Sequence, residues 1–310
     1  MQRPVLMRYN IAYILLVALL TLTACTNDEK EYDYSPDLNI TFSPAVTVST
    51  RAMSATYPED VPFGIWAYRL PHNQKWSTAT SEPALLLDNS YVTCSDNIWQ
   101  PEPSIMWPGN DKLTFFAYAP YDADMTFTKE RGVEFNDFDA TSGLIPMYTN
   151  PITDCDKELT NGCVALPFIQ TLTKVEFKVC SSIAHVGFRM FLKSLVIDNI
   201  AQRGSFNSLP EPKWGNLGDK TSLELCNDSI EVGMSLKTVG FRMLLSQAPN
   251  STIKFIVDIY DDKGELYAED FELKTDIIKD TWGVGKYYTY NIVLSNYDAT
   301  FTTDIFDNIK

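Results

Sequence analysis

The sequence predicts an all-β protein with two β-sandwich domains in tandem. Apolar residues recur with a period of two, turn-forming dipeptides separate these runs, and long stretches with a helical period are missing. Several short strands without alternating helices indicate antiparallel sandwiches rather than βαβ units. The 310 residues are enough for two domains of about 100 to 150 residues each.

Three segments show the strand pattern clearly. KVEFKV at 174–179 alternates apolar and charged residues, which is typical of a strand with one buried face. IKFIVDIY at 253–260 and YYTYNIVL at 287–294 are rich in β-branched and aromatic residues, which fit a pleated surface.

Glycine dipeptides mark the turns between such runs. They stand at Asn161-Gly162, Arg203-Gly204 and Lys263-Gly264. The polar stretch ITDCDKELTNGC at 152–163 separates two strand-rich halves. We therefore predict an N-terminal domain over residues 39–164 and a C-terminal domain over residues 165–310.

The first 24 residues have the three parts of an export signal. Arg3 and Arg8 are followed by an apolar run at 11–22 and by small residues directly before Cys25. The apolar run is shorter than the roughly 20 residues that a membrane-spanning helix needs. LTAC at 22–25 resembles the lipobox of bacterial lipoproteins, which predicts that Cys25 is acylated and becomes the new N-terminus. The alternative is a general signal peptide with a chance cysteine.

An acidic tether is predicted over residues 25–38. The acidic residues there are relieved only by Lys30, a composition typical of a solvated spacer. The run also resembles the acidic export tag of surface-displayed lipoproteins in Bacteroides-type bacteria. That resemblance implies an outer-membrane lipoprotein at the cell surface, and the alternative is an anchor that faces the periplasm.

Composition and motifs argue against several function classes, and among enzymes the abundant carboxylates leave only a glycosidase pair as an alternative. The chain has 25 Lys and Arg against 40 Asp and Glu, a net charge of −15, which argues against nucleic acid as a partner. His72 and His185 are the only histidines, and we find no phosphate loop, nucleophile elbow or paired metal motif. The sequence therefore predicts no enzyme activity, cofactor or metal. Trp76 and Trp99 are candidate sugar-stacking residues, with core packing as the alternative.

The cysteines do not form a recognisable framework. Five remain after Cys25, so they cannot all pair within one chain, and no Cys-x-x-Cys spacing is present. Cys155 and Cys163 flank a predicted turn and are candidates for one local disulfide. Free thiols are the alternative.

The order of aromatic strand motifs resembles the fimbrillin family, in its Mfa-like branch, whose members are subunits of Bacteroides-type (type V) pili. The runs that carry the resemblance are FGIWAY at 63–68, Trp107-Pro108, LTFFAYAPY at 113–121, LPF at 166–168, LTKVEF at 172–177, LVIDNI at 195–200, GSF at 204–206 with Trp214, and WGVGKYYTYNI at 282–292. The family often has a histidine where this chain has Gln170. Core packing is the structural alternative for each aromatic residue.

The resemblance implies two transthyretin-like sandwiches and a lipoprotein precursor that polymerises into a surface fibre supporting adhesion. It also implies that a trypsin-like protease cuts after an arginine, releases the first strand with its lipid, and leaves a groove for a strand of the next subunit. Here the candidate first strand is residues 39–48, and Arg51 and Ala52 match the cleavage position. A solvated loop arginine is the alternative for Arg51. The residues expected on one face of that strand are Ile40, Phe42, Val46 and Val48.

The C-terminal segment is the candidate donor strand. Phe301, Ile305 and Ile309 share one face, together with the polar Thr303 and Asp307, and are expected to enter pockets vacated by residues such as Ile40, Phe42 and Val48. The alternative is the last strand of the chain's own domain, or a frayed tail.

Several roles remain open within this function. The partners implied are other pilus subunits, membrane lipid through Cys25, and a ligand on a host or bacterial surface. A lipid-retained pilus anchor, a tip adhesin and a surface glycan-binding lipoprotein are alternatives to a polymerising subunit. Asp228-Ser229-Ile230 resembles an O-glycosylation acceptor of Bacteroides-type bacteria, so Ser229 is a candidate modification site.

Overall fold

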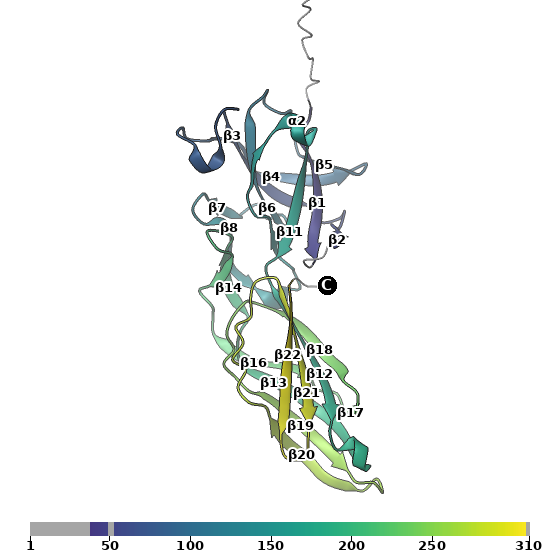
Figure 1. The fold of residues 1–310 in the computed structure, drawn as a ribbon. Coiled ribbons are helices and arrows are strands. Elements are labelled where there is room, and N and C mark those ends of the chain that lie inside the picture. The colour runs from purple at the N-terminus through teal and green to yellow at the C-terminus, as the bar shows by residue number, and fades with distance from the viewer. Residues whose placement is uncertain (1–37, 49–52, 308–310) are drawn as a thin grey trace, which may run out of the picture. The chain divides into compact units, whose positions relative to one another are not determined.

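The structure, a computed structural model, describes residues 38–48 and 53–307 (Figure 1). Their regular secondary structure is almost entirely β-strand, which confirms the predicted all-β fold with sandwiches in tandem. The helical segments are η1 (Trp76–Thr78), η2 (Ala140–Ser142), α2 (Lys157–Thr160) and η3 (Ala184–Val186). The predicted signal peptide, with Cys25, and the acidic tether up to residue 37 lie outside the described residues. Within the described part of the chain, no helix has the length and apolarity to span a membrane.

The first sandwich is one nine-stranded sheet that closes on itself. Its strands follow the order β10-β6-β3-β4-β5-β1-β11-β9, β2 pairs with β1, and an additional β6–β9 pairing joins the two halves of the sheet. They are β1 (Thr41–Val48), β2 (Met53–Thr56), β3 (Phe63–Leu70), β4 (Ala84–Ser95), β5 (Ile98–Pro101), β6 (Lys112–Ala119), β9 (Met147–Tyr148), β10 (Ile152–Cys155) and β11 (Cys163–Gln170). The enclosed core is rich in aromatic residues from β1, β3 and β6.

The second sandwich packs two separate sheets face to face. Its four-stranded sheet has the order β18-β12-β21-β22, and its five-stranded sheet has the order β16-β13-β19-β20 with β17 beside β13. The strands are β12 (Thr173–Ser181), β13 (Arg189–Ala201), β16 (Lys220–Cys226), β17 (Ile230–Val232), β18 (Lys237–Leu244), β19 (Ile253–Tyr260), β20 (Leu266–Lys274), β21 (Lys286–Leu294) and β22 (Ala299–Asp307). The alternation noted in 174–179 and 253–260 buries every second residue in this core.

A small third sheet joins strands from both sides of the predicted domain boundary. Its order is β15-β14-β8-β7. The strands are β7 (Thr126–Thr128), β8 (Gly132–Asp139), β14 (Arg203–Asn207) and β15 (Lys213–Gly215). Beneath it, aromatic residues of both halves form one core cluster. β7 and β8 precede residue 164, and β14 and β15 follow it. The two predicted domains are therefore joined by strand pairing as well as by the covalent connection between them.

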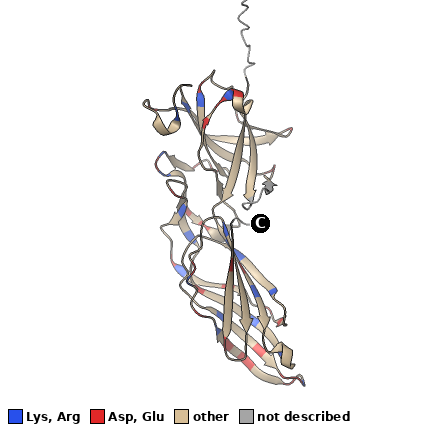
Figure 2. Cartoon of the chain, in the orientation of Figure 1, with Lys and Arg blue, Asp and Glu red and all other residues tan. Residues whose placement is uncertain are grey.

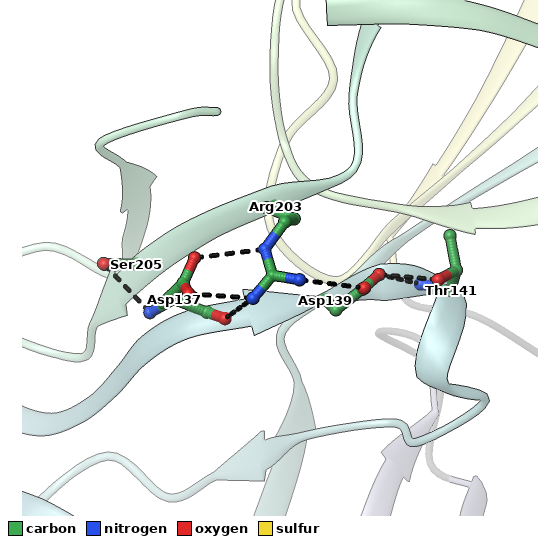
Figure 3. A network of polar contacts seen from close by, with 5 residues as sticks. All are labelled: Asp137, Asp139, Thr141, Arg203 and Ser205. Carbon is green, nitrogen blue, oxygen red and sulfur yellow. Dashed lines mark hydrogen bonds and ion pairs between the residues drawn. The ribbon is translucent and has the colours of Figure 1, made fainter. Parts of the chain in front are cut away.

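Arg203 clamps this shared sheet on its exposed surface (Figure 3). Its guanidinium bonds the carboxylate of Asp137 at 2.8 Å and that of Asp139 at 3.3 Å, both on β8. The hydrogen bond from Arg203 lowers the pKa of Asp137, and hydrogen bonds from Thr141 lower that of Asp139. Such exposed pairs contribute little stability individually, so the aromatic packing beneath them holds the sheet together.

The predicted boundary at 164/165 falls inside β11, a strand of the first sheet. The chain leaves that sheet at Thr171 and Leu172 and then forms β12. Two strand pairs are also parallel, β1 with β11 and β12 with β21, although the sequence predicted antiparallel sandwiches. Both pairs join strands far apart in the sequence, so local turn signals did not indicate them.

Charged residues of both signs are interspersed through both halves of the described chain (Figure 2). Several form cross-strand pairs on exposed sheet faces, such as Lys193 with Asp270 at 2.6 Å and Lys254 with Asp198 at 2.5 Å. The hydrogen bond from Lys254 lowers the pKa of Asp198. These exposed pairs contribute little to stability singly.

Candidate functional site

β1 is an interior strand of the first sheet, with partners on both sides. On one side it runs parallel to β11, from Thr41 opposite Cys163 to Val46 opposite Phe168 (Figure 1). On the other side it meets β5 where Phe42 faces Trp99, and it then pairs antiparallel with β2. The candidate first strand predicted from the sequence therefore lies in a slot between β11 and the β5–β2 side.

Main-chain hydrogen bonds hold the start of this segment in the slot. Thr41 N–H donates to the Gly162 carbonyl at 2.9 Å, and Ile40 N–H donates to the Ile105 carbonyl at 2.8 Å on the opposite side. Asn39 forms an antiparallel bridge with Met106. The strand is thus fixed by backbone bonds from two directions before its side chains are considered.

The side chains of β1 fill the core of the first sandwich. Ile40, Phe42 and Val46 are buried, with exposed fractions of 0%, 3% and 8%. The Phe42 ring packs edge-on against Phe63 at 5.8 Å and Phe115 at 5.7 Å. Ile40, Phe42 and Val46, which were predicted to share one face of the first strand, therefore all lie in the core. The side chain of Val48 lies outside the described residues.

Burial makes an empty slot unfavourable. Three apolar side chains at about 1.5 to 3 kcal/mol each give roughly 5 to 9 kcal/mol for the transfer of these groups alone. A small protein domain is stable by about 5 to 15 kcal/mol in total. Loss of β1 without a replacement would therefore remove much of the stability of this sandwich.

The predicted cleavage position lies in the link between β1 and β2. β1 ends at Val48 and β2 begins at Met53, so Arg51 and Ala52 fall in the connection. Both lie outside the described residues. Covalently, a cut after Arg51 separates all of β1 from the rest of the chain while β2 stays with the remainder.

The candidate donor residues lie in the other sandwich. β22 pairs antiparallel with β21 along its full length, at the edge of the four-stranded sheet. Phe301 packs against Tyr290, with ring centroids 5.5 Å apart, beside a surface depression of about 540 Å³ next to Asp280. Ile305 is 55% exposed, and Ile309 lies outside the described residues. In this structure the segment is thus the last strand of its own domain.

The tryptophans considered for sugar stacking and the two histidines differ in how deeply they are buried. Trp99 is in the core, which fits packing, whereas Trp76 is half-buried against Tyr68 and Phe116. His72 is exposed, with Nδ1 3.1 Å from the Asn110 carbonyl oxygen, and His185 is exposed beside the Ser182 carbonyl. Among the described residues, no group of acidic, histidine and cysteine side chains has the arrangement of a metal site.

The five described cysteines are free thiols, so the candidate pair Cys155 and Cys163 does not form a disulfide here. Burial raises the pKa of Cys155 to about 11, which disfavours its reactive thiolate. Cys163 is exposed at the start of β11, opposite Thr41 of β1. It offers a natural chemical probe of the slot.

Ser229 lies at a shallow surface depression of about 250 Å³ in the second sandwich, which Arg189 and Phe191 also line. The Arg189 guanidinium lies over the Phe191 ring at 5.0 Å and bonds Glu231 at 2.8 Å. Ser229 is therefore far from β1 in sequence and in a different sheet system.

Sequence reasoning missed the residues that frame the slot on the β2 side. Tyr57, directly after β2, is 2% exposed and packs against Trp99 at 5.3 Å and Phe168 at 5.0 Å. Its signal was weak, since a lone tyrosine before a proline is typical of a loop. Pro44 within an apolar run was a clearer signal, because proline is uncommon inside a sheet.

Comparisons with known proteins agree with this architecture. The family pattern described as fimbrillin-like matches residues 50–307, which include all strands from β2 to β22. Fimbrium subunit Fim1C of Phocaeicola vulgatus is 24% identical over 190 residues, a match that covers 52% of this chain and 49% of that protein. The chain thus spans about half the length of this curated relative.

Two solved structures share the fold. A fimbrial protein from Bacteroides vulgatus superposes with a TM-score of 0.68 at 17% identity, over 86% of this chain and 98% of that one. A putative cell adhesion protein from Bacteroides ovatus gives a TM-score of 0.54 at 14% identity, over 89% and 99% of the two chains. At these identities the likeness concerns the fold.

Proposed function

Because the chain belongs to the fimbrillin-like family, we propose that it is a structural subunit of a surface fimbria, made as a lipid-tethered precursor and polymerised by strand replacement. The subunit acts by assembly and carries out no catalysis of its own. Its partners are further pilus subunits, and its place is the fimbrium at the cell surface.

The observation that carries this proposal is the position of β1. This strand supplies buried core residues and is bonded on both sides, yet the link at 49–52 is its only covalent connection to the strands that follow. A cut after Arg51 by a trypsin-like protease turns β1 into a separate peptide that carries the acylated Cys25. The slot can then be emptied without cutting any further peptide bond, although β2 loses its pairing with β1 until a replacement strand arrives.

The replacement strand is the C-terminal segment of a second copy. Phe42 and Val46 are four positions apart in β1, and Phe301 and Ile305 are four positions apart in β22. If the incoming strand runs in the direction of β1, Phe301 takes the pocket of Phe42 and Ile305 takes the pocket of Val46. Backbone hydrogen bonds to β11 supply affinity, and these pockets set the register.

In the proposed register, Ile305 and Phe301 both enter more deeply buried positions. Ile305 is 55% exposed in its own sheet, whereas Val46, whose place it takes, is only 8% exposed. Phe301 leaves a half-buried site on Tyr290 for a fully enclosed one between Phe63 and Phe115. Burial of additional apolar surface therefore favours the assembled state.

Replacing Cys25 tests whether the chain reaches surface fibres by way of a lipid-tethered precursor. In cells expressing Cys25→Ala, we expect the precursor to leave the membrane fraction and this chain to disappear from surface fibres, since acyl chains supply about 0.8 kcal/mol per buried methylene. Fractionation and immunogold labelling provide the two readouts. Cys163→Ala, at an exposed cysteine, is the matched control. Membrane-bound Cys25→Ala precursor would contradict the tether, and wild-type fibres that lack this chain would contradict the subunit role.

A further inference from the structure

One position of β1 is poorly suited to an interior strand. Pro44 lies in the middle of β1, between the buried residues Phe42 and Val46. Proline has no main-chain N–H and is therefore normally confined to sheet edges and bulges. β1 nevertheless has strand partners on both sides.

The alternation of the backbone shows which side lacks the hydrogen bond. Thr41 N–H points toward β11, where it bonds Gly162, and Ile40 N–H points the other way, to Ile105. Successive N–H groups along a strand point in opposite directions. The nitrogen of Pro44 therefore points away from β11, toward the side on which β2 pairs.

The β1–β2 ladder ends at this position. Its register runs from Val48 opposite Met53 to Ala45 opposite Thr56, where β2 stops. One further step would set Pro44 opposite Tyr57. Because Pro44 cannot donate, this next pair lacks the hydrogen bond that would extend β2.

Tyr57, the residue that would come opposite Pro44, also carries a buried polar group without a partner in the described part of the chain. Tyr57 is 2% exposed, and its hydroxyl has no hydrogen-bond partner among the described residues. Burial raises the pKa of this phenol, so the group stays neutral and able to donate. A buried hydroxyl without a partner is costly, so polar groups around Tyr57 are incompletely satisfied while β1 occupies the slot.

We propose that position 44 of the slot selects the strand that replaces β1. In the resident strand this position is Pro44. When Phe301 takes the place of Phe42, the same position is occupied by Thr303 of a second copy. Thr303 supplies the missing main-chain N–H opposite Tyr57. β1 is thus an imperfect occupant that a strand from the same kind of chain outcompetes. This inference rests on the proposed function.

Peptide displacement tests the inference directly. The full chain carries a specific protease site in place of residues 49–52, is cut there, and is then mixed with labelled peptides spanning residues 299–310. Fluorescence anisotropy reports peptide binding, and mass spectrometry reports loss of β1. The three peptides are wild type, Thr303→Pro and Thr303→Val, of which only the proline variant lacks the N–H.

The expected result is a difference between the two variants. Thr303→Pro should bind at least about tenfold more weakly than wild type, and Thr303→Val should stay within about threefold. Equal affinity of wild type and Thr303→Pro would overturn the inference and leave the proposed function standing. Equal losses for both variants would place the effect in the side chain and also overturn it. A wild-type peptide that never displaces β1 would contradict the proposed donor strand itself.

A change in the resident strand gives an independent readout. Pro44→Thr restores the N–H in β1, so the wild-type peptide should displace β1 at least about threefold more slowly. Ser43→Thr is the matched control, since its N–H points toward β11 and its side chain is exposed. Unchanged displacement from Pro44→Thr, or equal slowing by both variants, would contradict the role of position 44.

Discussion

A Thr41→Cys chain is expected to stop extending fibres under oxidising conditions and to resume when a reductant is added. Thr41 lies directly opposite the exposed Cys163 on a parallel neighbour strand. Adjacent strands are about 4.8 Å apart, within the range that a disulfide spans. The new disulfide ties β1 to β11, so a protease cut can no longer free the strand, and polymer yield should fall to background.

The matched control separates the lock from the substitution. Thr41→Cys combined with Cys163→Ser has the same change in β1 but no partner thiol, and it should polymerise as the wild type does. Polymer is measured on gels and by electron microscopy with and without reductant. Normal fibre growth from chains shown by mass spectrometry to carry the 41–163 disulfide would mean that β1 need not leave.

Arg51→Ala is expected to accumulate as a membrane-bound monomer. The change removes the basic side chain that a trypsin-like protease needs. β1 then stays covalently attached and competes for its own slot at a high effective concentration, which for short linkers is on the order of millimolar. N-terminal sequencing of surface protein should give chains that begin at Cys25 rather than at Ala52.

Arg51→Lys is the control for charge and size. A trypsin-like protease also cuts after lysine, so this variant should restore chains that begin at Ala52 together with fibre growth. Fibres of Arg51→Ala made from uncut chains would point to a retained first strand, as in an anchor, or to another assembly route.

The sequence predicted local features well because local chemistry determines them. The alternation in 174–179 and 253–260 correctly indicated strands with one buried face, since a period of two follows directly from strand geometry. The buried face of β1, with Ile40, Phe42 and Val46, was likewise predictable from even spacing.

Long-range pairing was not predictable in the same way. Nothing near Thr41 indicates that it lies opposite Cys163, because such pairing depends on the packing of the whole sheet. The same holds for β8 with β14, which join residues on both sides of the predicted boundary and make it fall inside β11. Polar runs predict loops. A loop between two strands of one sheet has the same composition as a linker between domains, so composition alone does not distinguish them.

The most direct measurement is a disulfide between two subunits. In the proposed register, Thr300 of the incoming strand takes the place of Thr41 and so comes to lie opposite Cys163 of the next subunit. Fibres of Thr300→Cys should therefore give a ladder of covalent oligomers on non-reducing gels, and reductant should collapse it to monomer. Thr302→Cys, which arrives opposite Ala165, and Thr300→Cys with Cys163→Ser should give none. Fibres of Thr300→Cys without a ladder, or with the same ladder from Thr302→Cys, would contradict strand replacement by the C-terminus in this register.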